Sequence, residues 1–404
     1  MEISFRKLAL YSMYFYIASL YVLAYDPKLN LISKALFLIV CGWAAFNAIR
    51  TRELSKNTGF YIYMISFAAF ALLSTLWSPD FNFSIGKALT FCQVLFLSFL
   101  IVNMIKTEEE INNMFVAIFW GGMAMCAQAV ITYGVSYIFQ SLMEGNRLGK
   151  EINQANAFGL YTSIMVLIGL YQALYFKKKL YLLLMILPLI LAISSGSRKS
   201  LFILIVGMGI LFATKNGKIK ITKILIAIGA IIVVFAILYN IEAIRPVFKR
   251  LTTFLKLFDD SSEADTSTLT RLQMIRFGFE NFKKSPIIGY GIEGYDILYY
   301  RAFGELMPSH CNYIQILNSF GIIGFAMFYG IYFYIIKTAI SALKTNRNTA
   351  AFIIDIFIVN MVSDIGMTSI TQKFPFIYIG IGICFCNIIK AQKKKKLQEL
   401  KTKT

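Results

Sequence analysis

Residues 156–176 read NAFGLYTSIMVLIGLYQALYF, a run that contains no charged side chain. A helix that crosses a bilayer needs about 20 predominantly apolar residues, and this run is long enough. Hydrophobic residues make up 58% of the 404-residue chain and charged residues only 15%, whereas soluble domains carry about 25% charged residues. The sequence therefore predicts an all-α integral membrane protein that forms a single polytopic transmembrane domain over residues 1–404.

Similar apolar runs recur along the chain and predict about twelve transmembrane helices. Two of them, at 180–194 and 199–214, are short, so they are expected to tilt or to lie partly in the membrane interface. The twelve expected spans are residues 8–25, 31–49, 59–77, 85–105, 111–133, 156–176, 180–194, 199–214, 219–240, 313–336, 349–369 and 374–390.

Lys and Arg outnumber Asp and Glu to give a net charge of +19, and they concentrate in alternate connections between the expected spans. Cytoplasmic loops of membrane proteins are enriched in these residues, so the pattern places both termini in the cytoplasm. It also argues against a nucleic-acid partner, and residues 391–404 are expected to form a basic cytoplasmic tail that contacts anionic lipid. The basic residues concerned are Arg6, Lys7, Arg50, Arg52, Lys56, Lys177 to Lys179, Lys215, Lys218, Lys220, Lys223, Lys344, Arg347 and KKKK at 393–396.

The largest polar region is 241–312, which this topology makes one large extracytoplasmic loop containing short helices. One helix is expected in RLQMIRFGFENFKKSP at 271–286, where apolar residues recur at helical spacing and Pro286 should end the helix. ATP and nucleotide-sugars are absent at the outer face, so any reaction there must use an already activated substrate. The shared apolar face comprises Leu272, Ile275, Phe279 and Phe282.

Arginines in the outward segments are candidate anion-binding residues. In SSGSRKS at 194–200, serine and glycine offer backbone N–H groups at the start of a helix. Either Arg198 and Lys199 reach for lipid headgroups, or the turn binds an anion, which the bias against outward cations favours. Arg147 and Arg271 could complete a diphosphate site with Arg198, because guanidinium binds phosphate oxygens bidentately.

His310 is the only histidine of the chain and lies in MPSHCNY at 307–313. Its unperturbed pKa of about 6.5 suits proton transfer near neutral pH. The alternative is an interfacial histidine without a chemical role. Its place between the largest outer loop and the entrance of an expected span favours a functional one.

The sequence GYGIEGY at 289–295 matches the pattern G-x-G-x-x-G. It is not expected between a strand and a helix, so these glycines should serve a tight turn or close approach to a ligand.

Asp355 and Asp364 fall inside an expected span, where ionisable groups are costly. They are either ion-coupling carboxylates or paired with Lys87, Lys373 or an arginine. The six cysteines show no disulfide or metal-ligand spacing, so no metal site is expected.

Four motifs occur in an order typical of one family. NRLGKEINQANAFG at 146–159 is followed by Gly196-Ser197-Arg198, and then by Arg271 with a Pro-and-Gly pattern in the outer loop. Last comes H-x-N-Y at 310–313 with a G-x-x-G span. In this order the chain resembles the bacterial O-antigen ligase and polysaccharide polymerase family, the Wzy/WaaL-like integral membrane glycosyltransferases, although Ile275 replaces an aromatic residue of the pattern. The matching residues are Arg147, Asn153, Asn156, Gly196, Ser197, Arg198, Arg271, Pro286, Gly289, Gly291, His310, Asn312, Tyr313, Gly321 and Gly324.

The resemblance implies transfer of a glycan from an undecaprenyl diphosphate carrier to an acceptor hydroxyl at the outer face of the bacterial cytoplasmic membrane, without nucleotide, metal or other cofactor. In this interpretation three arginines bind the departing diphosphate and His310 is the base that accepts the hydroxyl proton. The arginines are Arg147, Arg198 and Arg271; candidate sugar or acceptor ligands are Asn153, Asn156, Glu293, Asn312 and Tyr313.

The preferred function is a polysaccharide polymerase that joins a lipid-linked chain to a lipid-linked repeat unit. An Ile- and Lys-rich composition is typical of low-GC bacteria, in which capsule or wall polymers replace lipopolysaccharide. An O-antigen or wall-polymer ligase would use the same residues with another acceptor. A lipid-linked oligosaccharide flippase and a non-catalytic partner of a synthase complex stay open, and a flippase and chain-length regulators are candidate partners of a polymerase.

Overall fold

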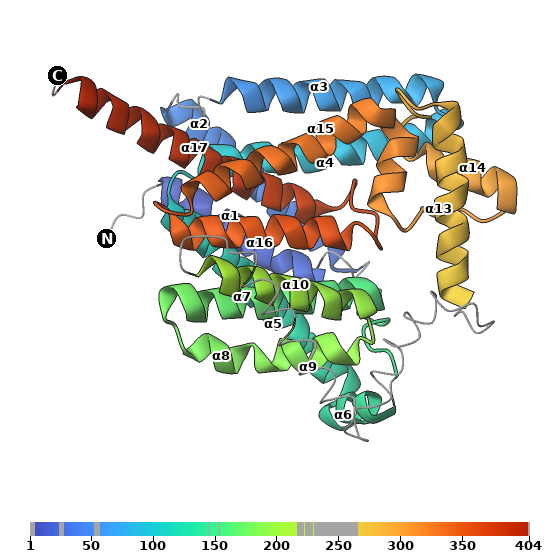
Figure 1. Ribbon diagram of the computed structural model, residues 1–404, viewed down its shortest axis with the longest axis horizontal. Helices are drawn as coiled ribbons and strands as arrows, with labels where there is room; N and C mark the ends of the chain where they lie inside the picture. Colours follow the sequence, from blue (N-terminus) through green and yellow to red (C-terminus); the bar gives the residue numbers. More distant parts are fainter. Residues whose placement is uncertain are drawn as a thin grey trace. The chain divides into compact units, whose positions relative to one another are not determined.

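The computed structural model describes residues 5–23, 28–51, 57–144, 146–152, 154–215, 222, 229 and 266–402. The regular secondary structure within these ranges is helical throughout, which confirms the all-α class (Figure 1). Seven helices are long and apolar enough to cross a membrane, and each coincides with an expected span. These helices indicate an integral membrane protein. They are Asn30–Arg50, Thr58–Trp77, Phe81–Met104, Glu108–Tyr133, Ala155–Phe176, Asn312–Ala342 and Lys373–Lys401.

Four other expected spans coincide with shorter helices. The span expected at 219–240 lies outside the described residues except for 222 and 229, so the total of twelve stays a prediction. The helix expected at 180–194 is divided at Met185. Pro188 explains the division, because it has no N–H to donate to the carbonyl of Leu184. The shorter helices are α1 (Phe5–Leu23), the pair α8 (Leu180–Leu184) and α9 (Ile186–Ser194), α10 (Arg198–Thr214) and α16 (Arg347–Ser363).

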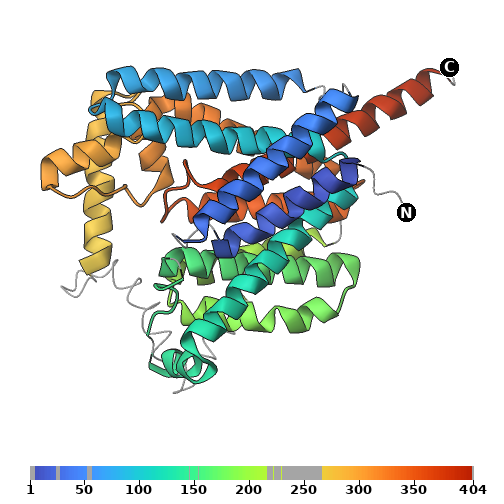
Figure 2. The same cartoon turned by 180° about the vertical axis from the view of Figure 1, so that it is seen from behind.

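The described helices form two compact units, of which the first comprises Met1–Glu53, Thr107–Glu263 and Ala339–Val359. Its central helix is α7 (Ala155–Phe176), whose most apolar window is 89% buried and which packs against α5, α9 and α10. Helix α1 packs against α2 and α5 (Figure 2). The bounds of the remaining helices are Asn30–Thr51 for α2, Glu108–Tyr133 for α5 and Val135–Glu144 for α6.

Helix α5 shows how the local sequence begins a helix in this unit. The Thr107 side chain accepts from the N–H of Glu110, and the Glu110 side chain accepts from the N–H of Thr107, forming a capping box. Arg6 of α1 also donates to the Glu110 carboxylate at 2.6 and 2.8 Å. This ion pair therefore fixes α1 to the first turn of α5.

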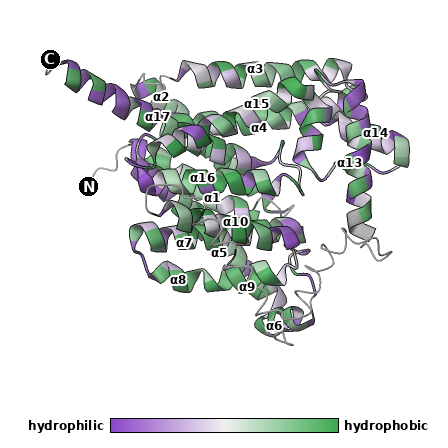
Figure 3. Cartoon of the chain, viewed as in Figure 1, coloured by the Kyte–Doolittle hydropathy of each residue, from purple (hydrophilic) through white to green (hydrophobic). Residues whose placement is uncertain are grey.

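The second unit comprises Leu54–Lys106, Ala264–Thr338 and Asn360–Thr404. Helix α4 packs against α3 and α17, and α13 runs crosswise to α3, α4 and α15. The hydrophilic residues of the expected basic tail continue α17 as a helix to Lys401 (Figure 3). The bounds are Thr58–Ser74 for α3, Phe81–Met104 for α4, Thr266–Lys284 for α13, Gly294–Phe303 for α14, Asn312–Ala342 for α15 and Lys373–Lys401 for α17.

Helix α13 confirms the helix expected at 271–286 and ends two residues before Pro286. Its apolar face is exposed, with Leu272 at 42% and Phe279 at 47% exposure, while Met274 is buried. The opposite face of α13 packs against Ile314 of α15, and Gly278 makes this possible. A Cβ at Gly278 would collide with the Ile314 side chain, so the missing side chain permits the close approach.

Helix α15 is interrupted at Gly321, whose φ of +62° and ψ of −160° are not helical. The segment after α13 lies against this interruption, since the N–H of Ile322 donates to the carbonyl oxygen of Pro286 at 2.8 Å. A Cβ at Gly321 would collide with the carbonyl oxygen of Ile287. Glycine is therefore required here both for the backbone angle and for the approach of two chain segments.

The glycines of GYGIEGY serve the same kind of contact. The motif lies between α13 and α14, so it is not a dinucleotide-binding turn. Gly289 and Gly291 have φ values of +66° and +83°. A Cβ on Gly289 would lie 2.5 Å from the carbonyl oxygen of Asn318, and one on Gly291 would collide with that of Ser74. The close approach predicted for these glycines is made to the protein itself.

Gly321→Ala is expected to destabilise the protein, whereas Gly330→Ala in the same helix should not. The backbone angles at Gly321 alone cost a side-chain-bearing residue about 1–3 kcal/mol, and the collision adds to this. A Cβ on Gly330 meets nothing within 4 Å. Thermal unfolding of the purified variants in detergent would measure the difference, and equal midpoints for the two would show that the interruption is not required.

Candidate active site

His310 occupies a strained backbone position immediately before α15. Its φ is +52°, and among the described residues only Lys177 and Glu293 share a positive φ without being glycine. Such a conformation costs about 1–3 kcal/mol and is concentrated at functional sites. The His310 side chain is half-exposed.

The turn around His310 is held by its buried neighbours. The Ser309 hydroxyl donates to the carbonyl oxygen of Cys311 at 2.7 Å and accepts from the N–H of Cys311 at 3.3 Å. The side-chain oxygen of Gln315 accepts from the N–H of Ser309 at 3.0 Å. These bonds connect the residues on both sides of His310 to each other and to α15.

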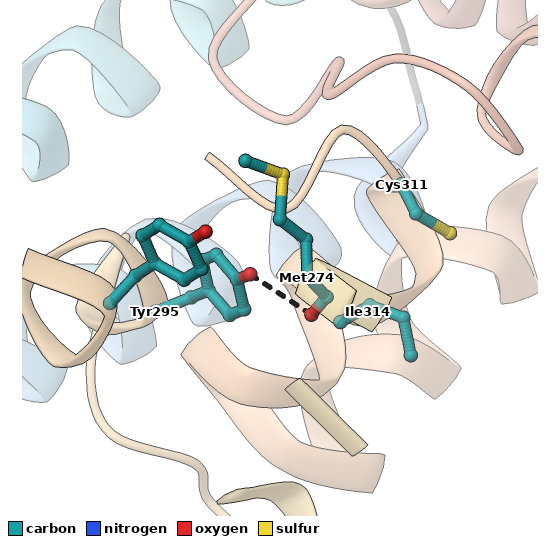
Figure 4. Close-up of a cluster of buried hydrophobic side chains, with 5 residues drawn as sticks. Met274, Tyr295, Cys311 and Ile314 are labelled. Atoms are coloured by element: carbon teal, nitrogen blue, oxygen red, sulfur yellow. Dashed lines mark hydrogen bonds between the residues drawn. The ribbon is translucent and has the colours of Figure 1, made fainter. Parts of the chain in front are cut away.

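A cluster of buried side chains forms the base of the turn (Figure 4). Met274 of α13, Tyr295 of α14 and Ile314 of α15 meet with Cys311, and the Tyr295 hydroxyl donates to the carbonyl oxygen of Met274 at 3.0 Å. Burial raises the pKa of the Cys311 thiol, so the thiol stays protonated and unreactive at neutral pH. The cluster therefore packs α13, α14 and the start of α15 together beside Cys311, the residue that follows His310.

Asn312 anchors the other side of the turn. Its side-chain amide donates to the Tyr329 hydroxyl and to the Asp364 carboxylate, each at 3.2 Å. Its side-chain oxygen accepts from the N–H groups of Ser369 and Ile370 at 2.8 and 3.1 Å. These four bonds use the full hydrogen-bonding capacity of an asparagine side chain, so Asn312 joins the turn to the segment before α17.

The structure corrects the position expected for Asp364. It lies in the turn after α16 and not inside a span. Its carboxylate accepts from the Tyr329 hydroxyl at 2.9 Å and from the Ser369 hydroxyl at 2.6 Å, and its carbonyl oxygen accepts from the N–H of Asn312. The hydroxyl of Tyr313 donates to the carbonyl oxygen of Met361 at 2.8 Å. Asp364 and Tyr313 thus secure the start of α15 against the end of α16.

Glu293 is buried just before α14. Its carboxylate pairs with Lys87 of α4 at 3.2 Å and accepts from the Thr371 hydroxyl at 3.1 Å, while its N–H donates to the Ser319 hydroxyl. Lys87, an expected partner of the aspartates in the eleventh span, is therefore paired with Glu293. Asp355, in the first unit, is fully buried, and its two oxygens have no hydrogen-bond partner in the part of the chain that the structure describes.

Two residues of the first motif lie together in the first unit. The Arg147 guanidinium donates to the side-chain oxygen of Asn156 at 2.7 Å and to the carbonyl oxygen of Ser195 at 3.4 Å. Ser197 then caps α10, whose first residue is the half-exposed Arg198. Two motifs thus meet at the N-terminus of α10 through a bond between residues 48 positions apart, and a helix N-terminus is a position that favours anions.

The remaining predicted residues are placed as follows. Asn153 lies outside the described residues. Arg271 is half-exposed on α13. Arg271, Glu293, His310, Asn312 and Tyr313 belong to the second unit, and Arg147, Asn156 and Arg198 to the first.

Comparison with protein families finds a match for the segment that contains most of these residues. Residues 182–329 match a family model described as O-antigen ligase. Over this segment the chain is similar to the O-antigen ligase family, and we refer to the segment as the O-antigen ligase domain. The match confirms the Wzy/WaaL-like resemblance and indicates a membrane O-antigen ligase or polymerase. No curated protein matches the chain.

The O-antigen ligase domain includes Arg198, Arg271 and the whole His310 turn, whereas Arg147 and Asn156 precede it. Its described part offers a half-exposed imidazole in a strained turn and half-exposed guanidinium groups on α10 and α13. An imidazole can accept a proton near neutral pH, and guanidinium groups can bind phosphate oxygens.

Sequence reasoning missed Ser309, Gln315 and Asp296 in this domain. Gln315 had a signal, because a polar residue in the first turn of an apolar run must find hydrogen bonds if it is buried. Asp296 had none. Its partner is Gln315, 19 positions further along the chain, and only the fold brings the two together.

Proposed function

We propose that the protein is a polysaccharide polymerase of the bacterial cytoplasmic membrane. It transfers a glycan from an undecaprenyl-diphosphate-linked donor to a hydroxyl of a lipid-linked repeat unit at the outer face. The observation that supports this function best is the half-exposed His310, held in a costly left-handed turn within the O-antigen ligase domain.

In the proposed reaction His310 is the general base. The O–H bond of the acceptor breaks and its proton moves to a ring nitrogen of His310, while the acceptor oxygen bonds to the anomeric carbon of the donor. The bond between that carbon and the diphosphate oxygen breaks, and the lipid diphosphate leaves with the electron pair. A base with a pKa near the working pH is suited to this step.

The departing diphosphate needs fixed positive charge, which the proposal assigns to Arg147, Arg198 and Arg271. Guanidinium groups stay charged at any physiological pH and bind phosphate oxygens in pairs. The backbone N–H groups at the start of α10 add to the binding of an anion beside Arg198. The bonds of Arg147 to Asn156 and Ser195 support this role, because they fix its guanidinium beside that turn.

The ligase alternative uses the same groups and differs only in the acceptor. The flippase alternative is favoured by one observation, the fully buried Asp355 carboxyl without a hydrogen-bond partner among the described residues. Ionisable groups at membrane depth often serve transport. Asp355→Asn should leave elongation of lipid-linked repeats unchanged if the protein is a polymerase.

The deciding experiment incubates the purified protein with lipid-linked repeat units in the presence of a chelator. A ladder of lipid-linked chains is expected, since the repeat unit serves as both donor and acceptor. Transfer only to an added lipid or wall acceptor would identify a ligase. Absence of any transfer by the purified protein would contradict the proposal, and elongation that stops in chelator would contradict its metal-independent form.

A further inference from the structure

A chain of buried hydrogen bonds leads from the His310 turn into α14. Gln315, which accepts from the N–H of Ser309, also donates its side-chain amide to the Asp296 carboxyl at 2.6 Å. Asp296 is 5% exposed and Gln315 is fully buried. The orientation of the Gln315 amide, and with it the bond to Ser309, is therefore set by Asp296.

Glu293, three residues before Asp296, acts electrostatically on the Asp296 carboxyl. Burial and the Glu293 charge raise the pKa of the Asp296 carboxyl to about 8, against the opposing effects of Gln315 and Lys87. Asp296 thus keeps its proton at neutral pH, while the Glu293 carboxyl lies 3.2 Å from the Lys87 ammonium.

We propose that Asp296 and Gln315 are positioning residues that hold the His310 turn in its left-handed conformation. The inference rests on the proposed function, in which His310 is the catalytic base. Neither residue has the exposure to touch substrate. They act through Ser309, whose hydroxyl bridges His310.

The arrangement has the features that such a role requires. Asn312 fixes the turn from the side of α16 and α17, whereas Asp296 and Gln315 fix it from the side of α14. If the Gln315 amide is released, the turn at His310 loses one of the hydrogen bonds that hold it. The strained backbone at His310 can then relax, and the imidazole moves from its working position.

The first test compares Asp296→Ala with Asp296→Asn. Asparagine has the same size and keeps an oxygen that accepts from Gln315, so elongation should stay near the wild-type rate. Alanine removes the acceptor, and elongation should fall at least about tenfold, the typical effect of one lost buried hydrogen bond. Glu280→Gln, which breaks an exposed ion pair with Lys283 on α13, is the matched control and should have no effect.

The second test exchanges the amide of Gln315 and the carboxyl of Asp296 between the two positions. Gln315→Glu places a third carboxyl beside Glu293 and Asp296, and elongation should be lost. Adding Asp296→Asn to it recreates one amide and one carboxyl in the opposite order, so the bonds to Ser309 and between the two positions can form again. Because the oxygen of the introduced asparagine then faces the Glu293 carboxyl, partial recovery of elongation in the double variant is expected. Failure of the double variant to recover would contradict a role for this hydrogen bond.

A readout independent of catalysis is the reactivity of Cys311 toward a membrane-impermeant maleimide, with Cys311→Ser as background. The thiol is 7% exposed in the turn and should label faster in Asp296→Ala and Gln315→Glu, but not in Asp296→Asn. General unfolding would also label Cys384 and Cys386, which are buried in α17; labelling confined to Cys311 identifies the turn.

The outcomes distinguish the positioning role of Asp296 and Gln315 from the role of His310 as the catalytic base. Unchanged elongation and unchanged Cys311 labelling in Asp296→Ala and Gln315→Glu would overturn the positioning role while leaving His310 as the base. Faster Cys311 labelling in those variants, together with full elongation by a His310 variant, would instead uphold the support of the turn and contradict the proposed function.

Discussion

Replacing His310 with glycine is expected to lower chain elongation by about 10²–10⁴-fold, the usual contribution of a positioned general base. Glycine adopts the φ of +52° at this position without strain, so the turn keeps its conformation and only the imidazole is lost. Asparagine also tolerates this conformation, and His310→Asn should be equally inactive. Alanine is a poorer choice because it combines loss of the base with backbone strain.

In cells the His310→Gly variant should lack long polymer while single repeat units still reach the outer face of the membrane. Gel analysis of extracted polymer, together with surface labelling of lipid-linked units, measures both. Long polymer at the wild-type level would contradict a catalytic His310. Loss of surface repeat units together with polymer would point to the flippase alternative, because the defect would then precede polymerisation.

Arg198→Ala is expected to lower the rate of elongation by about 10²-fold or more, the usual effect of removing one group that stabilises developing charge. Arg198→Lys should recover only part of this rate, because an ammonium group lacks the fork that binds two phosphate oxygens. The neighbouring Lys199→Ala is the matched control. Its side chain is also half-exposed in the first turn of α10, and its loss should have little effect on elongation.

The same comparison separates a specific diphosphate contact from a general attraction to anionic lipid. A lipid-headgroup role would make the Arg198 and Lys199 variants behave alike, and added salt would reduce the remaining difference. An equal loss in both variants, with full recovery in Arg198→Lys, would contradict the assignment of Arg198 to the diphosphate. Arg147→Ala should resemble Arg198→Ala, because Arg147 is bonded to the turn that precedes Arg198.

The helical spans could be predicted because their signal is local. A run such as 156–176 is apolar over its whole length, and a helix is the simplest way to satisfy its backbone within lipid. The division between α8 and α9 was not predicted, although Pro188 gives a local reason for it. The face of α13 that packs inward was not predicted either. Gly278 permits the close approach of Ile314, and the sequence does not show that these two residues meet.

The candidate residues of the site were found by residue type and order, but their supporting contacts were not. The chemistry of a lone histidine and outward arginines is visible in the sequence. The left-handed turn at His310 is not, because it depends on Ser309 and Gln315 acting together. Asn312 was expected to bind sugar, and its supporting contacts were not foreseen, because three of its four hydrogen bonds join segments more than 50 positions apart.

The most direct test of His310 as the base is the elongation rate of purified His310→Gly with and without added imidazole. Elongation is expected to be lost in the variant and partly restored by imidazole, and the restoration should rise with pH as neutral imidazole, of pKa near 7, becomes available. Elongation at the wild-type rate without imidazole would contradict the assignment of His310 as the general base.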